Sequence, residues 1–397
     1  MSDNKELTVL LTLWDRVPCT FRWMAYASKV NLPFRVLIAD GGSDQSVAEV
    51  LANRTNFPNV DYEYIRYPYD ATPTHYYTKV LDALNRVETP FVVLADNDDF
   101  FVVDALLRSL EFLKNHEDFN SCRGNIAGFK ITPDVGLGEL SNIYGRGVSF
   151  VRQIYPNESN LEKTALQRVH NYFLSYRANW YDVFRTEQTR HSFQVLRDLD
   201  TQDHAISQYV LMLLGVIAGK EQIEPYVYLF RQLEGPATCT QVELQQNDFF
   251  DRMLLDTWST DFKGFLEAIS TAISEKDGIP IEEARRQVKL GYRTLMTPGI
   301  VNCLLGSVPQ PRRFRKARQL VSRMGPAGSA LRKLYPFVRR IIRGESDYPR
   351  HDFIPADELL ETDNDFKLIL DFLATPPPSA IGPQQTTLRA NLEHSSS

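Results

Sequence analysis

Short apolar runs alternate with amphipathic stretches over the first 130 residues of the chain. Apolar or β-branched runs that end at polar or glycine-containing turns predict strands, and apolar positions at helical spacing between them predict helices. This alternation is typical of an α/β domain built on a mostly parallel sheet. The predicted strands are Leu7–Leu13, Phe34–Ala39, Val60–Ile65, Phe91–Ala95 and Asn125–Ile131.

The pattern divides the chain into three predicted regions. Residues 1–245 form the α/β domain, which includes a helix at Thr74–Arg86 and, later, strands at Trp180–Phe184 and Pro225–Phe230 on either side of a helix at Thr201–Lys220. Residues 246–345 predict a helical C-terminal region that contains a basic segment. Residues 346–397 predict an acidic, Pro-containing tail that is partly disordered.

Composition supports a globular protein, since 43% of the 397 residues are hydrophobic and 24% are charged. The four cysteines show neither metal-ligand nor redox spacing, which favours a reducing, cytoplasmic setting. The short polar segment Met1–Glu6 leaves no room for a signal peptide. The longest apolar run, Tyr209–Gly219, falls short of the roughly 20 residues of a spanning helix. We therefore expect a cytoplasmic protein.

Charge is distributed unevenly along the chain. The formal net charge is -6, yet residues 285–344 contain 15 Lys and Arg and no Asp or Glu. Between Arg312 and Arg343 these basic residues are mixed with bulky apolar ones, which predicts peripheral contact with the anionic inner face of the cell membrane. The alternative is a solvated helix face packed on the first domain. We expect no nucleic-acid partner.

One candidate functional site is the acidic motif Asp96-Asn97-Asp98, which directly follows the predicted strand Phe91–Ala95. Ligands of such sheets bind beyond the carboxyl ends of the strands. Carboxylates this close together repel one another unless a cation lies among them, and oxygen ligands favour Mn²⁺ or Mg²⁺. A solvated acidic turn is the alternative, because a three-residue motif matches often by chance.

A second polar cluster, Asp40-Gly41-Gly42-Ser43-Asp44, also follows a predicted strand. This motif, followed some fifty residues later by an apolar strand and Asp96-Asn97-Asp98, resembles glycosyltransferase family 2 and its relatives with the GT-A fold. The resemblance covers the first domain only. It implies a Rossmann-like mixed sheet flanked by helices, to which this chain adds the helical C-terminal region.

The resemblance also implies roles for individual residues. Asp98 and Asp96 would bind the metal, with Asp96 also meeting the ribose. Lys79 would face the donor from the helix Thr74–Arg86, with a solvent-facing lysine as the alternative. Thr12, Arg16 and Asp40 would hold the nucleotide base, so the complete predicted set for the nucleotide sugar is Thr12, Arg16, Asp40, Lys79, Asp96 and Asn97.

Transfer with inversion needs a base that removes the proton of the acceptor hydroxyl. Asp203 lies where the resemblance implies the base, and Asp200 is a competitor. The family usually has Glu-Asp where this chain has Gln202-Asp203, and the Arg that often follows one turn later is absent. Alternatively, Asp200 or Thr201 caps the helix and Asp203 complements its positive N-terminus.

The sequence thus predicts a metal-dependent, inverting glycosyltransferase. The donor would be a UDP-sugar and the acceptor a sugar hydroxyl of a surface polysaccharide or glycolipid, loosely placed near Trp180, Tyr172 and Tyr176. One alternative is a nucleotidyltransferase acting on a sugar phosphate. Such enzymes usually have a glycine-rich loop where this chain has Leu13–Pro18. Another is a non-catalytic membrane-associated assembly protein. Whether the protein forms a homodimer is left open.

Overall fold

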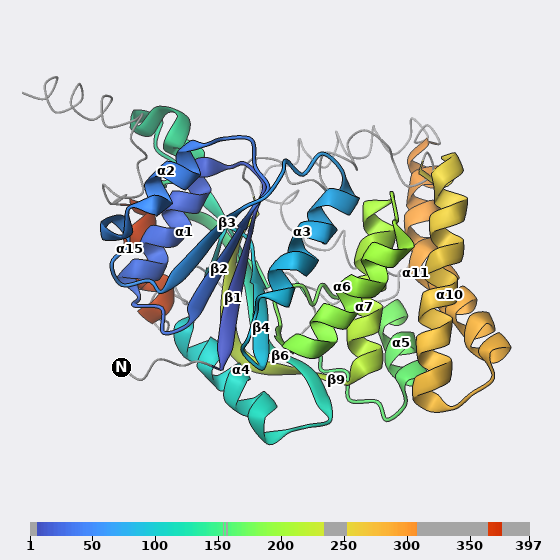
Figure 1. Cartoon of the computed structure of the whole chain (residues 1–397). Helices are drawn as coiled ribbons and strands as arrows, with labels where there is room; N and C mark the ends of the chain where they lie inside the picture. The colour runs from blue at the N-terminus through green and yellow to red at the C-terminus, as the bar shows by residue number, and fades with distance from the viewer. Residues whose placement is uncertain (1–5, 154, 156–157, 234–251, 308–363, 375–397) are drawn as a thin grey trace, which may run out of the picture.

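The computed structural model describes residues 6–153, 155, 158–233, 252–307 and 364–374. Its centre is a nine-stranded mixed sheet flanked by helices, as predicted (Figure 1). The order is β3-β2-β1-β4-β8-β6-β9-β5, and β7 pairs with β6. The strands are β1 (Leu7–Leu13), β2 (Arg35–Asp40), β3 (Tyr62–Arg66), β4 (Phe91–Ala95), β5 (Asp99–Phe101), β6 (Phe119–Pro133), β7 (Gly145–Gln153), β8 (Val183–Arg185) and β9 (Lys220–Gln232).

The first four strands run parallel, with β1 paired to β2 on one side and to β4 on the other. The short strand β8 is antiparallel to both β4 and β6, while β9 is parallel to β6 and antiparallel to β5. Strands β2 and β4 pair with opposite edges of β1, so the strand order reverses at this point of the sheet. A crevice is expected beyond the carboxyl ends of β1 and β4 at such a point.

Both faces of the sheet are buried, which is why β1 and β4 are apolar at nearly every position. Alternate residues enter two hydrophobic cores: Leu7, Val9 and Leu11 belong to one and Leu10 to the other. The first core is covered by α1 (Val17–Lys29), α2 (Ser46–Ala52), α4 (Val103–Asn115) and α15 (Asn364–Ala374). The second is covered by α3 (Pro73–Asn85), α5 (Ala165–Leu174), α6 (Thr186–Leu199), α7 (His204–Ala218), α10 (Asp256–Asp277) and α11 (Ile281–Ser307).

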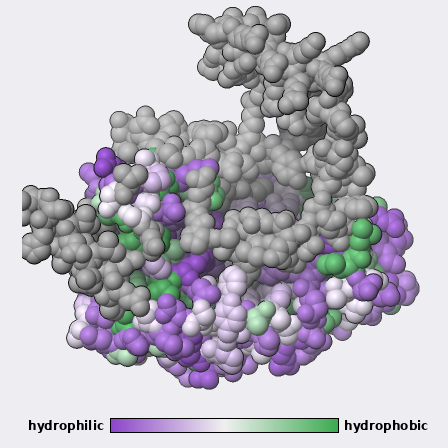
Figure 2. All heavy atoms as spheres, turned by 90° about the horizontal axis from the view of Figure 1, so that it is seen from above, coloured by the Kyte–Doolittle hydropathy of each residue, from purple (hydrophilic) through white to green (hydrophobic). Residues whose placement is uncertain are grey.

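Two 3₁₀ helices complete the described elements, at Arg54–Asn56 and Val135–Asn142. Figure 2 shows the molecule turned by 90° from Figure 1. On this face the described surface is mainly hydrophilic, with several hydrophobic patches. Among the described helices, none combines the length and the apolar character that crossing a bilayer would require.

The predicted strands of the first domain are confirmed as elements, although Trp180–Phe184 overlaps β8 only at Val183 and Phe184. Phe91–Ala95 and Leu7–Leu13 agree with β4 and β1, whereas Asn125–Ile131 is only the middle of the longer β6. Pro73 occupies the first turn of α3, where its missing N–H costs nothing. The helix predicted from Thr201 begins instead at His204, because Asp203 is its N-cap.

Three helices in the predicted C-terminal regions pack directly on the first domain. Helices α10 and α11 bury Phe265 and Val288 in the second core, and Figure 1 shows both beside α5 and α7. Helix α15, which lies within the predicted tail, buries Phe366 and Phe372 in the first core. The predicted domain boundaries therefore do not separate independent cores among the described residues. The basic segment Arg312–Arg343 lies outside them.

Candidate functional site

The segments that follow the carboxyl ends of β1 and β4 carry most of the chemically suggestive side chains. The loop after β1 contains Asp15 and Arg16, and the segment after β4 contains Asp96, Asn97 and Asp98. Parallel pairing of Leu11 with Ala95 brings these two segments to the same edge of the sheet. The next parallel strand, β2, ends at Asp40.

Three carboxylates form a compact acidic cluster at this edge. Asp96, Asp98 and Asp99 each offer an oxygen, and these oxygens all lie within 4.8 Å of one another. Burial, and next the charge of Asp98, raise the pKa of both Asp96 and Asp99. Asp99 had no role in the sequence analysis. It joins the cluster because β5 begins at this residue and pairs with β9.

The cluster fits a divalent cation on its own chemistry. The Asp99 Oδ2 atom is buried and has no hydrogen-bond partner, which is costly unless something else satisfies it. Hard oxygen ligands are those that Mg²⁺ and Mn²⁺ prefer. Asp96 is held in place by the Tyr181 hydroxyl, which donates to its Oδ2 at 2.7 Å.

Two described arginines flank the acidic cluster. Arg16 Nη1 donates to Asp98 Oδ2 at 2.7 Å. Arg231 Nε lies 3.9 Å from Asp99 Oδ2, while its Nη1 donates to the Tyr155 hydroxyl at 2.9 Å. Sequence analysis missed Arg231, because a single arginine near the end of a strand carries no signal of its own.

The loop that carries Arg16 is strained. Asp15 and Arg16 have φ angles of 54° and 55°, in the left-handed region that non-glycine residues seldom adopt. Asp15 Oδ1 accepts hydrogen bonds from Ser43 N at 2.6 Å and Ser43 Oγ at 2.8 Å. The buried Asn97 Nδ2 donates to Thr20 Oγ1 at 3.0 Å and lies 3.4 Å from the Arg16 carbonyl. Asn97 thus braces this loop.

Asp40 organises the second polar cluster. Its carboxylate accepts from Gly42 N at 2.8 Å, the Tyr64 hydroxyl at 2.7 Å and Arg66 Nη1 at 2.6 Å. A Cβ on Gly41 would lie 2.3 Å from an Asp70 oxygen, so this turn needs glycine for close approach. The role of Asp40 in binding a nucleotide base stays a prediction.

Lys79 is buried, so the alternative of a solvent-facing lysine is wrong. Its Nζ donates to the Leu13 carbonyl at 2.8 Å and to the Asp70 carboxylate. The side chains of Lys79 and Asp70 are only 2% and 3% exposed. Asp70 was not predicted, because it lies in the loop after β3 and belongs to no motif. The pair connects α3 to the loop beneath Gly41.

Helix α3 also reaches the site through Tyr76. Its hydroxyl lies 3.1 Å from Thr12 Oγ1, and its ring stacks on Trp180 with 6.4 Å between centroids. Thr12 is buried near the end of β1. Of the three aromatic residues suggested for acceptor binding, Tyr172 is fully buried in the core.

Asp203 and Asp200 lie together at the start of α7. Asp203 Oδ1 caps the helix by accepting from Ile206 N at 2.9 Å, and both of its oxygens accept from Arg252. Asp200 is exposed, and its Oδ1 accepts from Thr74 Oγ1 at 2.9 Å. The cap of α7 is thus Asp203 itself and not Asp200 or Thr201, and the base role of either aspartate stays a prediction.

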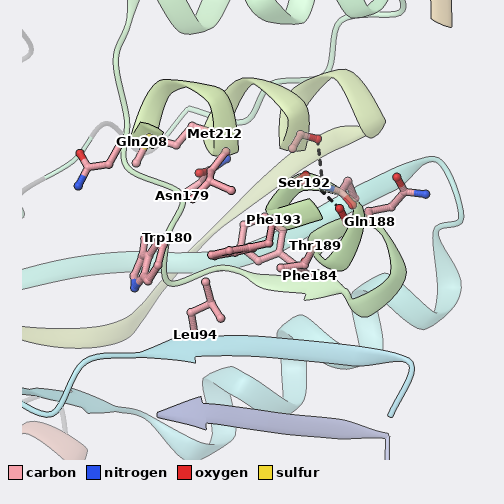
Figure 3. A pocket seen from close by; sticks show the side chains of 13 residues that line it. Leu94, Asn179, Trp180, Phe184, Gln188, Thr189, Ser192, Phe193, Gln208 and Met212 are labelled. Carbon is pink, nitrogen blue, oxygen red and sulfur yellow. Dashed lines mark hydrogen bonds between the residues drawn. The ribbon is translucent and has the colours of Figure 1, made fainter. Parts of the chain in front are cut away.

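A small cavity lies between α6, α7 and the sheet (Figure 3). Its volume of about 30 Å³ suffices for about two water molecules. Trp180, Asn179 and Met212 are among its lining residues. The cavity is too small for a sugar ring. Its lining residue Trp180 also stacks on Tyr76 of α3.

Comparison with known proteins gives weak similarities. The sequence matches no protein-family model and no curated protein. The crystal structure of S. aureus TarS 1–349 in complex with UDP-GlcNAc is 13% identical, covering 77% of this chain and 93% of that one, with a TM-score of 0.41. The mannosyltransferase PcManGT from Pyrobaculum calidifontis, in complex with GDP-Man and Mn²⁺, is 9% identical over 86% of this chain and 88% of that one, with a TM-score of 0.37. The function therefore has to be inferred from this chain's own side chains.

Proposed function

We propose that this protein is a metal-dependent glycosyltransferase that moves a sugar from a nucleoside diphosphate donor to an acceptor hydroxyl. The observation that carries the proposal is the acidic cluster Asp96, Asp98 and Asp99, with oxygens within 4.8 Å of one another, which follows β4 where its carboxyl end lies beside that of β1. A switch point of an open α/β sheet is where nucleotides commonly bind.

In the proposed reaction the acidic cluster holds Mn²⁺ or Mg²⁺. A bound divalent cation would neutralise the charge that grows on the departing diphosphate. Arg16, at the same edge, lies where it can meet the diphosphate once the donor is bound. Asp40 and Thr12, near the ends of β2 and β1, would meet the base, and the buried Lys79 would support this side of the site through Leu13 and Asp70.

We further propose that the donor is a UDP-sugar and the acceptor a sugar hydroxyl of a surface polysaccharide or glycolipid. These finer assignments come from the family resemblance of the sequence. The predicted membrane contact through Arg312–Arg343 falls outside the described residues and stays a prediction, as do the cytoplasmic location and a homodimer.

The metal role is tested by Asp98→Asn. Transfer from UDP-sugars with Mn²⁺ should fall by about 100-fold or more, because one charged ligand of the cation is lost. Asp104→Asn, an exposed acid on α4 outside the cluster, is the matched control and should retain activity. Full transfer by Asp98→Asn, or in excess chelator, would contradict the proposal.

The base is tested by comparing Asp203→Asn with Asp200→Asn. Asparagine keeps an oxygen that can cap α7 but cannot take a proton. If Asp203 is the base, its variant should lose kcat with little change in the donor KM, whereas Asp200→Asn should stay active. The reverse result would assign the base to Asp200. Retained anomeric configuration in the product would exclude both from that role.

The two other functions remain distinguishable by experiment. A nucleotidyltransferase would release pyrophosphate instead of a nucleoside diphosphate. In place of the glycine-rich loop typical of that class, this chain has the strained Asp15–Arg16 turn. A non-catalytic assembly protein would bind neither UDP nor Mn²⁺ in a calorimetric titration.

A further inference from the structure

Arg16 lies against the acidic cluster, beside Asp98. Its Nη1 donates to Asp98 Oδ2 at 2.7 Å, and the two side chains are 14% and 12% exposed. The pair is therefore within reach of solvent and of ligands. Without a cation, this contact satisfies one carboxylate of a cluster that otherwise repels itself.

The backbone of Arg16 is fixed by hydrogen bonds, while its side chain extends to Asp98. Its carbonyl accepts from Cys19 N at 2.9 Å in the first turn of α1, and Asn97 braces the same carbonyl. The residue before it is tied to Ser43. A change of partner at Arg16 can thus occur by side-chain rotation alone.

We propose that Arg16 is an exchangeable counter-ion: a divalent cation displaces its guanidinium from Asp98, and the displaced guanidinium then binds the diphosphate of the donor. The inference rests on the function proposed above. It deepens that function by making cation binding and nucleotide binding mutually dependent, with Arg16 as the positioning residue that links them.

Arg231 does not fit the same exchange. It lies 3.9 Å from Asp99, is bonded to the Tyr155 hydroxyl, and its guanidinium carbon lies 4.9 Å from the centroid of the Tyr181 ring. These contacts hold it beside the cluster whether or not Asp99 binds a cation. Arg231 is therefore a matched control that carries the same charge at the same site.

The exchange predicts positive coupling between the two ligands. Without nucleotide, Mn²⁺ must break the Arg16–Asp98 contact. With UDP present, the displaced guanidinium gains a phosphate partner, so Mn²⁺ should bind more tightly. By linkage, Mn²⁺ must tighten UDP binding by the same factor.

The test is calorimetric titration of the full chain with Mn²⁺, with and without saturating UDP, for wild type, Arg16→Gln, Arg16→Lys and Arg231→Gln. Arg16→Gln should bind Mn²⁺ about tenfold more tightly in the absence of UDP, since no guanidinium then competes for Asp98. The factor by which UDP tightens Mn²⁺ binding should fall about tenfold. Arg16→Lys, which keeps the charge, should retain most of the coupling, and Arg231→Gln should retain all of it.

The outcomes separate this inference from the function on which it rests. If wild type binds Mn²⁺ and UDP but Arg16→Gln changes neither the Mn²⁺ affinity nor the coupling, the exchange is wrong and the proposed function stands. Equal loss of coupling in Arg16→Gln and Arg231→Gln would also overturn it, because general electrostatics would then be sufficient. If wild type binds neither ligand, both proposals fail.

Discussion

At the residue scale, the candidate site contains a buried pair of opposite charges. Lys79 and Asp70 are almost completely buried and lie beneath the glycine turn that follows β2. Burial raises the pKa of Asp70, and the charge of Lys79 opposes that rise. Such a pair stabilises little as a unit, but removing one partner leaves an uncompensated charge.

Lys79→Met should therefore destabilise the protein by about 3–5 kcal/mol. Urea denaturation followed by circular dichroism measures the change. The double variant Lys79→Met/Asp70→Asn should recover part of the loss, because no buried charge then lacks a partner. A loss below about 1 kcal/mol in the single variant would mean that Asp70 is solvated or protonated in the fold.

At the element scale, the start of α7 is a polar junction formed with α3 and with Arg252, which precedes α10. Asp203 caps α7, Arg252 binds Asp203, and the Nδ1 atom of His204 lies 2.9 Å from the hydroxyl of Tyr77 on α3. Burial lowers the pKa of His204 from 6.5 to about 4; Asp203 opposes this shift and Arg252 adds to it.

The lowered pKa predicts acid-sensitive stability. The folded state prefers neutral His204, so this contribution is complete above pH 6.5 and is lost as the pH falls from 6.5 to about 4. The difference between the pKa of 6.5 in the unfolded state and about 4 in the folded state corresponds to about 3 kcal/mol of stability. Urea denaturation at pH 7, 6 and 5 should show the decline.

His204→Gln should flatten the decline between pH 6.5 and 4. His191→Gln, at an exposed position on α6, should leave it unchanged. An identical slope in wild type and His204→Gln would show that other groups cause the acid sensitivity.

At the scale of the whole molecule, the end of the described chain stabilises the beginning. The ring of Phe372 in α15 lies 5.8 Å from that of Tyr26 and 6.2 Å from that of Phe100. Phe366 stacks on Phe230 of β9 at 5.0 Å. Phe100 directly follows Asp99, so α15 packs behind the strand that positions the acidic cluster.

Phe372→Ala should accordingly cost about 3–5 kcal/mol, the range for removing a large buried aromatic side chain. Lys367→Ala on the exposed side of the same helix is the control and should change stability by less than about 0.5 kcal/mol. Thermal and urea denaturation measure both. If Phe372→Ala is as stable as wild type, α15 does not belong to the core in solution.

Much of the fold was predictable because its signals are local. The buried strands β1 and β4 are continuous apolar runs, and polar residues end them where the chain leaves the sheet. Helix α3 was found from its spacing and its proline. By contrast, α15 lies in a tail whose composition indicated disorder, and only its packing on Phe100 and Phe230 explains its order.

The sequence by itself determined that two aspartates follow a buried strand, since an apolar run and the residues after it are neighbours in the chain. Tertiary structure alone decided that Asp99 completes the cluster, that Arg16 and Arg231 flank it, and that Asp203 pairs with Arg252. The physical reason is sequence separation. Arg16 and Asp98 are 82 residues apart, and the strand order that joins them is set by the packing of both sheet faces.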